Sequence, residues 1–184
     1  MKTDLYIGAE WKAGADGERI SVLDPATGEE FASVAAGTPA DAHNACDVAA
    51  AAQKTWAKVA PRDRSEILRN CWSVLLDHTD ELAEIIVREN GKPLADAKGE
   101  VAYAAEFFRW NAEETVRIKG SIGTAPSGAN KIIVHHPPVG VVVMVTPWNF
   151  PAAMITRKVA PALGAGNAVV IKPPKETPLT ALRV

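Results

Sequence analysis

The chain has 184 residues, 47% of them hydrophobic and 23% charged, which is the composition of a folded globular protein and excludes disordered and fibrous classes. Its 20 Lys and Arg residues nearly balance its 22 Asp and Glu residues, and the net charge of -2 argues against nucleic acid or an anionic membrane as a partner. The N-terminus lacks the apolar stretch of a signal peptide and no apolar run approaches the roughly 20 residues that span a bilayer, so we expect a cytoplasmic protein.

Residues 5–37 alternate short extended runs with turn residues, a pattern that predicts a small antiparallel meander. A helix is predicted to follow, because Thr38 places a capping hydroxyl before Pro39 and apolar residues then recur every three or four positions until Pro61. The same spacing predicts further helices over residues 67–76, 79–90 and 94–119. The block from residue 39 to residue 119 should therefore form a helical layer.

The next segment, residues 120–138, places Gly, Ser and Pro around one extended run at 131–136, which predicts a projecting hairpin or an edge strand. The unbroken apolar run at 139–145 predicts a strand buried on both faces of a parallel sheet. A helix predicted to open at 149–151 and a second apolar strand at 168–172 complete one βαβ unit, whose crossover should be right-handed.

The last residues repeat the capping pattern, since Thr177 precedes Pro178, yet the sequence stops six residues after Pro178. A helix of that length is not stable alone, and a single βαβ unit leaves both edges of its sheet unpaired. We therefore expect the sequence to be the front piece of a larger protein.

The strongest local signal for chemistry is the hexapeptide TPWNFP at residues 146–151, directly after the first strand of the βαβ unit. In open α/β sheets, ligands bind beyond the carboxyl ends of the strands. One interpretation is a turn that holds two prolines and a packed Trp148. The other is that Asn149 points its side-chain amide into the crevice, where an N–H donor can stabilise a developing oxyanion. The spacing of the residues leaves both interpretations open.

Three cationic side chains are predicted near the same edge of the sheet. Lys172 and Lys175 follow the second strand and could meet a cofactor phosphate or ribose, while Arg157 on the helix could hold a carboxylate. Solvated surface cations are the alternative for all three. The stretch GAGN at 164–167 is not a phosphate-binding loop, because it follows a helix and precedes a strand, and we interpret it as a helix C-cap.

Neither cysteine is predicted to be a nucleophile or part of a disulfide framework. Cys46 and Cys71 lie on apolar helical stripes with no neighbouring base, so we interpret both as core thiols. The four histidines show no metal-ligand spacing, and no metal site is predicted.

Several of these segments resemble a known family. TPWNFP, followed at this spacing by VVIKP (169–173), resembles the opening of the cofactor domain in the aldehyde dehydrogenase superfamily, and ELAEIIVRENGKPLADAKGEV (81–101) resembles its succinate-semialdehyde dehydrogenase branch. The resemblance covers essentially the whole chain. It implies an α/β fold, the N-terminal part of an aldehyde dehydrogenase with an incomplete Rossmann-like cofactor domain. The implied divisions are 1–119 for the meander and helical part of the cofactor domain, 120–138 for part of an oligomerisation hairpin, and 139–184 for the first βαβ unit.

The resemblance implies oxidation of an aldehyde to an acid. A cysteine thiolate attacks the carbonyl, hydride passes from the thiohemiacetal to the nicotinamide, and water hydrolyses the thioester with help from a glutamate base. In this sequence Asn149 would be the oxyanion-hole amide that holds the thiohemiacetal oxygen. The residues implied to contact the cofactor are Val145, Thr146, Pro147 and Trp148 at the nicotinamide end and Lys172 at the adenosine ribose.

Two positions refine the implied cofactor and substrate. Where NAD-preferring members carry a glutamate three residues after the ribose lysine, this chain has Lys175, whose ammonium would attract a 2'-phosphate, so NADP is favoured with NAD possible. Arg157 would pair with the distal carboxylate of a small semialdehyde such as succinate semialdehyde, with Phe150 and Met154 as neighbouring walls of the substrate tunnel.

The resemblance also implies that the nucleophilic cysteine and the glutamate base lie beyond residue 184, so that this chain alone is inactive. The parent enzyme would be a homodimer or homotetramer assembled in part through the 120–138 hairpin. The alternative is a naturally short, non-catalytic relative that acts as a binding or assembly module.

Overall fold

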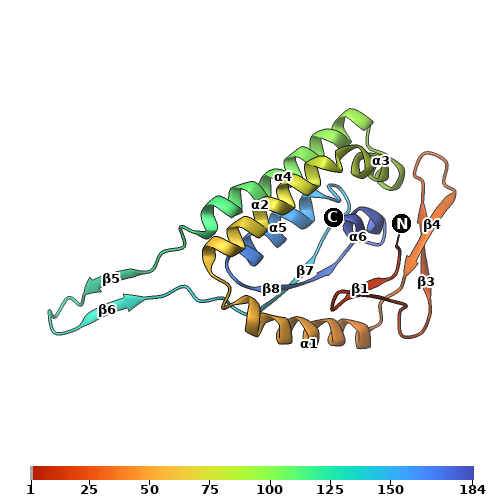
Figure 1. The fold of residues 1–184 in the computed structure, drawn as a ribbon. Coiled ribbons are helices and arrows are strands. Elements are labelled where there is room, and N and C mark those ends of the chain that lie inside the picture. Colours follow the sequence, from red (N-terminus) through yellow and green to blue (C-terminus); the bar gives the residue numbers. More distant parts are fainter. Residues whose placement is uncertain (1) are drawn as a thin grey trace.

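The computed structural model describes residues 2–184. The helices are α1 (Pro39–Trp56), α2 (Pro61–Asp77), α3 (Thr79–Asn90), α4 (Leu94–Thr115), α5 (Ala153–Gly164) and α6 (Pro178–Arg183). The strands are β1 (Leu5–Ile7), β2 (Glu10–Lys12), β3 (Arg19–Leu23), β4 (Glu30–Ala35), β5 (Ser121–Thr124), β6 (Lys131–Val134), β7 (Val141–Val145) and β8 (Ala168–Lys172). Figure 1 shows α2, α4 and α5 in one layer, with α1 on the opposite side of β7 and β8. Among residues 2–184, none of the helices is both long enough and apolar enough to cross a bilayer.

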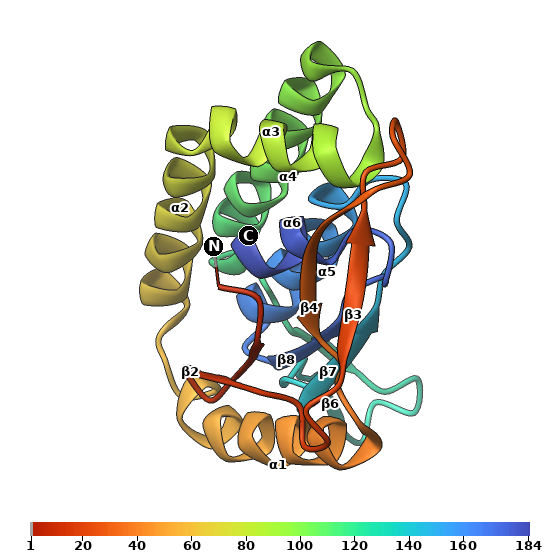
Figure 2. The ribbon, with the colours of Figure 1, turned by 90° about the vertical axis from the view of Figure 1, so that its right-hand side faces the viewer.

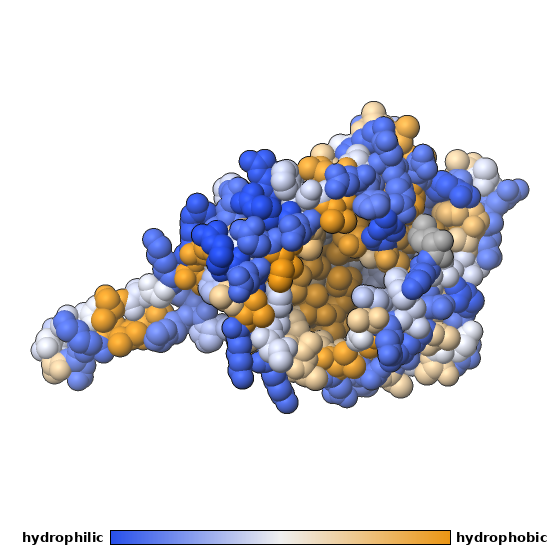
Figure 3. Space-filling model, in the orientation of Figure 1, coloured by the Kyte–Doolittle hydropathy of each residue, from blue (hydrophilic) through white to orange (hydrophobic). Residues whose placement is uncertain are grey.

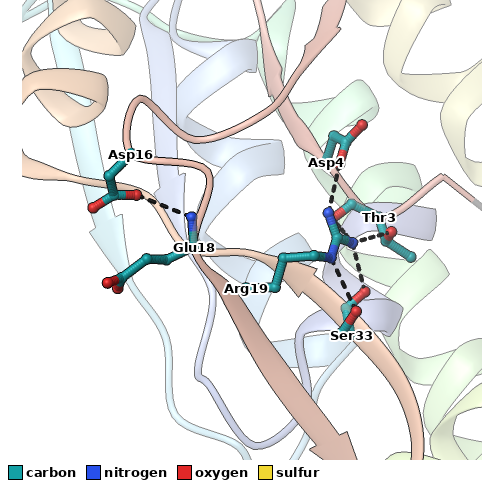
Figure 4. A network of polar contacts seen from close by, with 6 residues as sticks. All are labelled: Thr3, Asp4, Asp16, Glu18, Arg19 and Ser33. Carbon is teal, nitrogen blue, oxygen red and sulfur yellow. Dashed lines mark hydrogen bonds and ion pairs between the residues drawn. The ribbon is translucent and has the colours of Figure 1, made fainter.

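The N-terminal strands form two separate antiparallel pairs, β1 with β2 and β3 with β4, rather than the continuous meander predicted from the sequence. β1 and β2 have three residues each. The Arg19 guanidinium on β3 links the β3–β4 pair to the residues before β1, because it donates to the Asp4 carboxylate (3.0 Å) and the Thr3 hydroxyl (2.6 Å), and it also donates to the Ser33 hydroxyl on β4 (2.9 Å), as Figure 4 shows. The Ala35 amide adds a backbone bond to the Thr3 carbonyl (2.9 Å).

The helices from α1 to α4 follow one another in the predicted order, although α1 ends at Trp56 rather than at Pro61 and α2 begins at Pro61 rather than near residue 67. Thr38 and Asp41 form a capping box at α1, in which the Asp41 amide donates to the Thr38 hydroxyl (3.2 Å) and the Thr38 amide donates to the Asp41 carboxylate (2.9 Å). The predicted stop of α3 at residues 90–91 is confirmed, because Gly91 takes the left-handed conformation with φ of 74°. α4 ends at Thr115, short of the predicted residue 119, because the Arg117 amide bonds to the Glu114 carbonyl in a tighter turn.

The main apolar core lies between helices α2 to α5 and one face of the β7–β8 sheet. Its largest fully buried members include Leu68, Leu82, Ile86 and Val101. A smaller cluster of Val22, Val34, Ile85 and Leu179 joins the β3–β4 hairpin to α3 and α6, and Figure 2 shows this hairpin in front of α6. The C-terminal helix is therefore enclosed by elements from the first half of the chain.

The segment between α4 and β7 is a projecting hairpin, one of the two forms predicted for it. β5 and β6 pair antiparallel and extend away from the rest of the molecule in Figure 1. Every residue of both strands is exposed, Ile122 by 74%. The role of this hairpin in assembly stays a prediction.

β7, α5 and β8 form the predicted βαβ unit, and the two strands pair in parallel from Val141 with Ala168 to Val145 with Lys172. The prediction that β7 is buried on both faces is wrong. Successive side chains of a strand point to opposite faces, and only the Met144 face packs into the core, while Val143 and Val145 are 58% and 65% exposed. Figure 3 shows a hollow with an apolar floor in the part of the molecule where Figure 1 places β7 and β8.

The start of α6 after Thr177 and Pro178 agrees with the sequence, but the predicted cap does not. The Thr177 hydroxyl is buried, and within residues 2–184 it has no hydrogen-bond partner. The α6 amides of Leu179 (2.7 Å) and Thr180 (2.8 Å) donate instead to the carboxylate of Glu89, which comes from the last turn of α3. A carboxylate at a helix N-terminus satisfies its free amides and complements its dipole, which explains why Glu89 replaces the hydroxyl.

Candidate active site

The loop of residues 146–152 lies at the carboxyl end of β7, at the same edge of the sheet as the end of β8. Val145 and Lys172 are paired across the two strands, and the Thr146 amide donates to the Lys172 carbonyl at 3.3 Å. This is the edge at which open α/β sheets bind their ligands. The structure thus brings the TPWNFP loop and the predicted cofactor lysine together, as the order of strands predicts.

Asn149 lies in the middle of this loop with an exposed side chain. Its backbone carbonyl accepts a hydrogen bond from the Lys92 ammonium at 3.3 Å, and within residues 2–184 no hydrogen bond engages its side-chain amide. The backbone of Asn149 is anchored while its amide N–H donors are free to meet a ligand. That arrangement fits the oxyanion interpretation better than that of a closed turn, in which the amide would be bonded locally.

Three side chains from the end of α3 and from α4 hold the loop. The Asn90 side-chain amide donates to the Trp148 carbonyl (3.0 Å), and Glu100 Oε1 accepts from the amides of Ala152 (2.9 Å) and Ala153 (3.3 Å). Lys92 forms an ion pair with Glu100 and also contacts the loop. Sequence reasoning missed all three of these residues, although Glu100 stands four positions before Ala104 on the apolar stripe of α4, where an acidic residue is out of place.

The residues predicted to line the nicotinamide end lie together but do not all face solvent. Val145, Pro147 and Trp148 are exposed at the loop, whereas Thr146 is buried and its hydroxyl lies 3.5 Å from the Lys172 carbonyl. These three exposed residues are accessible to a planar ligand such as a nicotinamide ring. Thr146 is placed to fix the start of the loop.

Of the two predicted cofactor lysines, Lys172 is the last residue of β8 and Lys175 lies three residues beyond it. Both are exposed. Lys175 Nζ lies 4.0 Å from the Glu176 carboxylate, an exposed pair that solvent weakens. Two exposed ammonium groups at the ligand edge fit the phosphate and ribose of a dinucleotide, so the residues present are compatible with the implied cofactor.

The predicted substrate residues lie just before α5 and in its first turns. Arg157 is exposed and its Nη1 lies 3.9 Å from the sulfur of Met154, one turn earlier on the helix. Phe150 is 40% exposed, and the Lys92 ammonium lies 4.1 Å from the centre of its ring. All three predicted substrate residues lie within eight positions after Asn149 in the sequence. The Arg157 guanidinium is exposed and accessible to an anion.

Other predictions from the sequence concern residues outside this loop. Residues 164–167 form the predicted helix C-cap, with φ of 85° at Gly166 and its amide bonded to the Leu163 carbonyl. Cys46 and Cys71 are both free and half-buried, and burial raises the pKa of the Cys71 thiol. A thiol with a raised pKa is a poor nucleophile, which agrees with the interpretation of Cys71 as a core residue.

Comparison with known proteins gives consistent matches over nearly all of the chain. The aldehyde dehydrogenase family model matches residues 11–184. The chain is 53% identical over 151 residues to a succinate-semialdehyde dehydrogenase of Paenarthrobacter nicotinovorans, and 44% identical over 182 residues to the NADP(+) succinate-semialdehyde dehydrogenase of Escherichia coli. These alignments cover 82% and 99% of the chain.

A solved structure, the succinate-semialdehyde dehydrogenase of Burkholderia pseudomallei, superimposes on 99% of the chain with a TM-score of 0.96 and 44% identity. The chain spans 34% of the length of the Paenarthrobacter protein and 38% of the length of the other two.

Proposed function

The chain belongs to the aldehyde dehydrogenase family, and from this premise we propose that it forms part of an NADP-dependent enzyme that oxidises succinate semialdehyde, or a similar semialdehyde, to the acid. The observation that carries the proposal is the placement of Asn149, whose free side-chain amide stands on an anchored backbone at the ligand edge of a parallel sheet. The names of the similar proteins support the substrate class and the cofactor.

In the proposed reaction, the Asn149 amide donates a hydrogen bond to the oxygen of the substrate carbonyl. Charge grows on that oxygen as a cysteine thiolate adds to the carbonyl carbon, so a donor held in place beforehand lowers the barrier without reorganising. Neither cysteine lies in the loop of residues 146–152: Cys46 is on α1 and Cys71, whose pKa is raised by burial, is on α2. We therefore propose that the nucleophile and the glutamate base that activates water lie outside these 184 residues, and that the chain alone does not turn over.

We propose that the cofactor binds along the carboxyl ends of β7 and β8. Val145, Pro147 and Trp148 would contact the nicotinamide end, Lys172 the adenosine ribose, and Lys175 the 2'-phosphate of NADP. The bound cofactor supplies the acceptor for the hydride of the aldehyde carbon. A lysine in place of a carboxylate at position 175 favours the phosphorylated cofactor because opposite charges attract where like charges would repel.

The Arg157 guanidinium is the proposed partner of the substrate's distal carboxylate. It is exposed, it lies in the second turn of the helix that leaves the loop, and its fork geometry suits two hydrogen bonds to a carboxylate. Phe150 and Met154 would form the apolar walls between the carboxylate and the reacting carbonyl. A four-carbon semialdehyde has the two polar ends that this arrangement requires.

For the remaining parts, we propose that residues 1–119 and 139–184 belong to the cofactor domain and that residues 120–138 contribute to a homodimer or homotetramer interface. The exposed isoleucines of the hairpin, Ile122 and Ile133, support this assignment. Replacing both with aspartate should shift the enzyme to a smaller species in size-exclusion chromatography with light scattering, and an unchanged mass would contradict the assignment.

The substrate test uses the dehydrogenase that contains this segment, assayed by NADPH formation. Arg157→Ala should raise KM for succinate semialdehyde roughly 10- to 100-fold, since it removes a charge-assisted hydrogen bond pair. Butanal, which has the same chain length and no carboxylate, is the matched control, and its KM should stay within about 2-fold. Equal effects on both aldehydes would refute the substrate class, and no turnover with either by the parent enzyme would refute the function.

The cofactor test compares NADP and NAD in the same enzyme. Lys175→Glu should lower the ratio of kcat/KM for NADP to that for NAD by on the order of 10-fold or more, because a carboxylate repels the 2'-phosphate. Lys54→Glu, an equal change of charge on an exposed position of α1, is the control and should leave the ratio unchanged. A ratio unaffected by Lys175→Glu would remove Lys175 from the cofactor site.

A further inference from the structure

Beside the Asn149 loop lies a buried ion pair that the reaction itself does not use. Lys92 follows Gly91 at the end of α3, Glu100 lies on α4, and their side chains are 14% and 1% exposed. A buried ion pair is weak evidence of a stabilising role, because removing two charges from water offsets their mutual attraction. The location of this pair calls for another explanation.

Both members of the pair bind the backbone of the loop. The Lys92 ammonium donates to the Asn149 carbonyl at 3.3 Å, and Glu100 Oε1 accepts from the amides of Ala152 at 2.9 Å and Ala153 at 3.3 Å. The remaining oxygen of Glu100 holds Lys92. The loop is thus attached to one rigid unit at Asn149 itself and again at the start of α5.

We propose that Lys92 and Glu100 are positioning residues that fix the peptide of Asn149 and thereby aim its side-chain amide at the reacting oxygen. The proposal rests on the oxyanion role of Asn149 proposed above. Neither Lys92 nor Glu100 needs to touch the substrate, because the Lys92 bond is made to the backbone carbonyl of Asn149 and the Glu100 bonds are made to backbone amides. An oxyanion donor is effective only where it is preorganised, and a misplacement of about 1 Å can cost on the order of 100-fold in rate.

The ring of Phe150 provides a second contact between Lys92 and the loop. The Lys92 ammonium lies 4.1 Å from the ring centre, within the range of a cation–π contact. Lys92 therefore contacts two consecutive loop residues, Asn149 through the backbone and Phe150 through the side chain. A neutral side chain at position 92 would lose both contacts together.

The test uses the complete dehydrogenase with variants of the pair. Lys92→Met should lower kcat roughly 10- to 100-fold, while KM for the aldehyde and for the cofactor stays within about 2-fold. Lys98→Met, which breaks the exposed pair of Lys98 on α4 with Asp80 on α3, is the matched control and should leave kcat unchanged. Because Lys92→Met leaves Glu100 buried without a cationic partner, the double variant Lys92→Met/Glu100→Gln is measured beside it, and the same fall in kcat is expected.

A double-mutant cycle with Asn149→Ala separates positioning from a structural role. If Lys92 acts through Asn149, then Lys92→Met should lower kcat by less than about 2-fold in the Asn149→Ala background. An equal loss in both backgrounds, or an undiminished kcat in either Lys92 variant, would overturn the positioning role while leaving the function of Asn149 intact. If Asn149→Ala alone keeps its full kcat, the proposed function of Asn149 fails, and the positioning role fails with it.

Discussion

Two buried glutamates cap two helices in this molecule, and their surroundings differ. Glu100 receives the first amides of α5 and is paired with Lys92. Glu89 receives the amides of α6, and within residues 2–184 no ion pair includes it. Each residue is 3% exposed, so burial does not distinguish them. What differs is the presence of a cation, which only the cap beside the candidate active site has.

The difference shows in the titration of Glu89. Burial raises its pKa to about 7, against an ordinary value near 4.5, and the nearby charge of Glu100 acts in the same direction. The α6 cap therefore changes charge within the physiological range of pH. At the loop of residues 146–152, by contrast, the glutamate that accepts from the backbone amides is paired with the Lys92 ammonium.

The largest effect on stability is expected from removing Glu100, the capping glutamate that has a cationic partner. Glu100→Ala should lower the free energy of unfolding by about 3–5 kcal/mol, because it leaves the Lys92 ammonium buried without its partner. In the dehydrogenase, which is more than twice as long as this chain, this corresponds to a fall in the midpoint of thermal unfolding of roughly 3–5 °C. Glu106→Ala on the exposed face of α4 is the control and should shift the midpoint by very little. An equally small shift for Glu100→Ala would mean that the Lys92–Glu100 pair does not contribute to the stability of the fold.

The second prediction concerns the pH dependence that Glu89 imposes. Because the folded-state pKa lies above the unfolded one, the folded protein holds this proton more tightly, and stability falls as pH rises from about 4.5 to about 7. The shift corresponds to about 3 kcal/mol over that window. Glu89→Gln cannot ionise, so its stability relative to the parent should increase by this amount across the window.

Thermal unfolding at several pH values measures the effect of Glu89→Gln. Glu84→Gln, an exposed change of the same kind on α3, should show no such trend. A difference between Glu89→Gln and the parent that stays constant with pH would contradict the unpaired state of Glu89.

The smallest effect on stability is expected at the C-terminal end of α6. Arg183 donates to both carboxylate oxygens of Glu81 (2.6 Å each), and this contact holds the pKa of Glu81 at about 2. The pair is partly exposed, so Arg183→Ala should cost less than about 1 kcal/mol near pH 7. Since the pKa of Glu81 is lowered, its contribution is present above about pH 4.5 and is lost as the pH falls toward 2. A large loss at pH 7 would show that this pair, rather than the Glu89 cap, holds α6.

Local rules in the sequence predict much of the fold. The capping box at Thr38, the glycine stop at Gly91 and the apolar runs of β7 and β8 each act over a few residues, and the structure confirms the elements they define. The exposure of Val143 could not be predicted in this way, because an apolar strand looks the same whether one or both of its faces are covered.

The candidate site likewise contains residues that the sequence predicts and residues that it does not. Asn149 and Lys172 could be placed at one edge because parallel strands align their carboxyl ends. The supporting residues Lys92 and Glu100 could not be assigned, since they reach the loop through contacts that join residues 57 and 52 positions apart in sequence. One signal is shared by both glutamates: Glu89 and Glu100 each occupy a position on the inward stripe of an amphipathic helix, where a buried carboxylate needs a specific partner.

The most direct test of the proposed site is the rate of NADPH formation in a single turnover by the complete dehydrogenase, at saturating succinate semialdehyde. Asn149→Ala should slow this step by roughly 100- to 1,000-fold, because it removes the donor that stabilises the developing oxyanion. The midpoint of thermal unfolding should stay unchanged, since the Asn149 side chain is exposed and its anchoring bond is made by the backbone. A single-turnover rate within about 2-fold of the parent, in a folded variant, would contradict the assignment of Asn149.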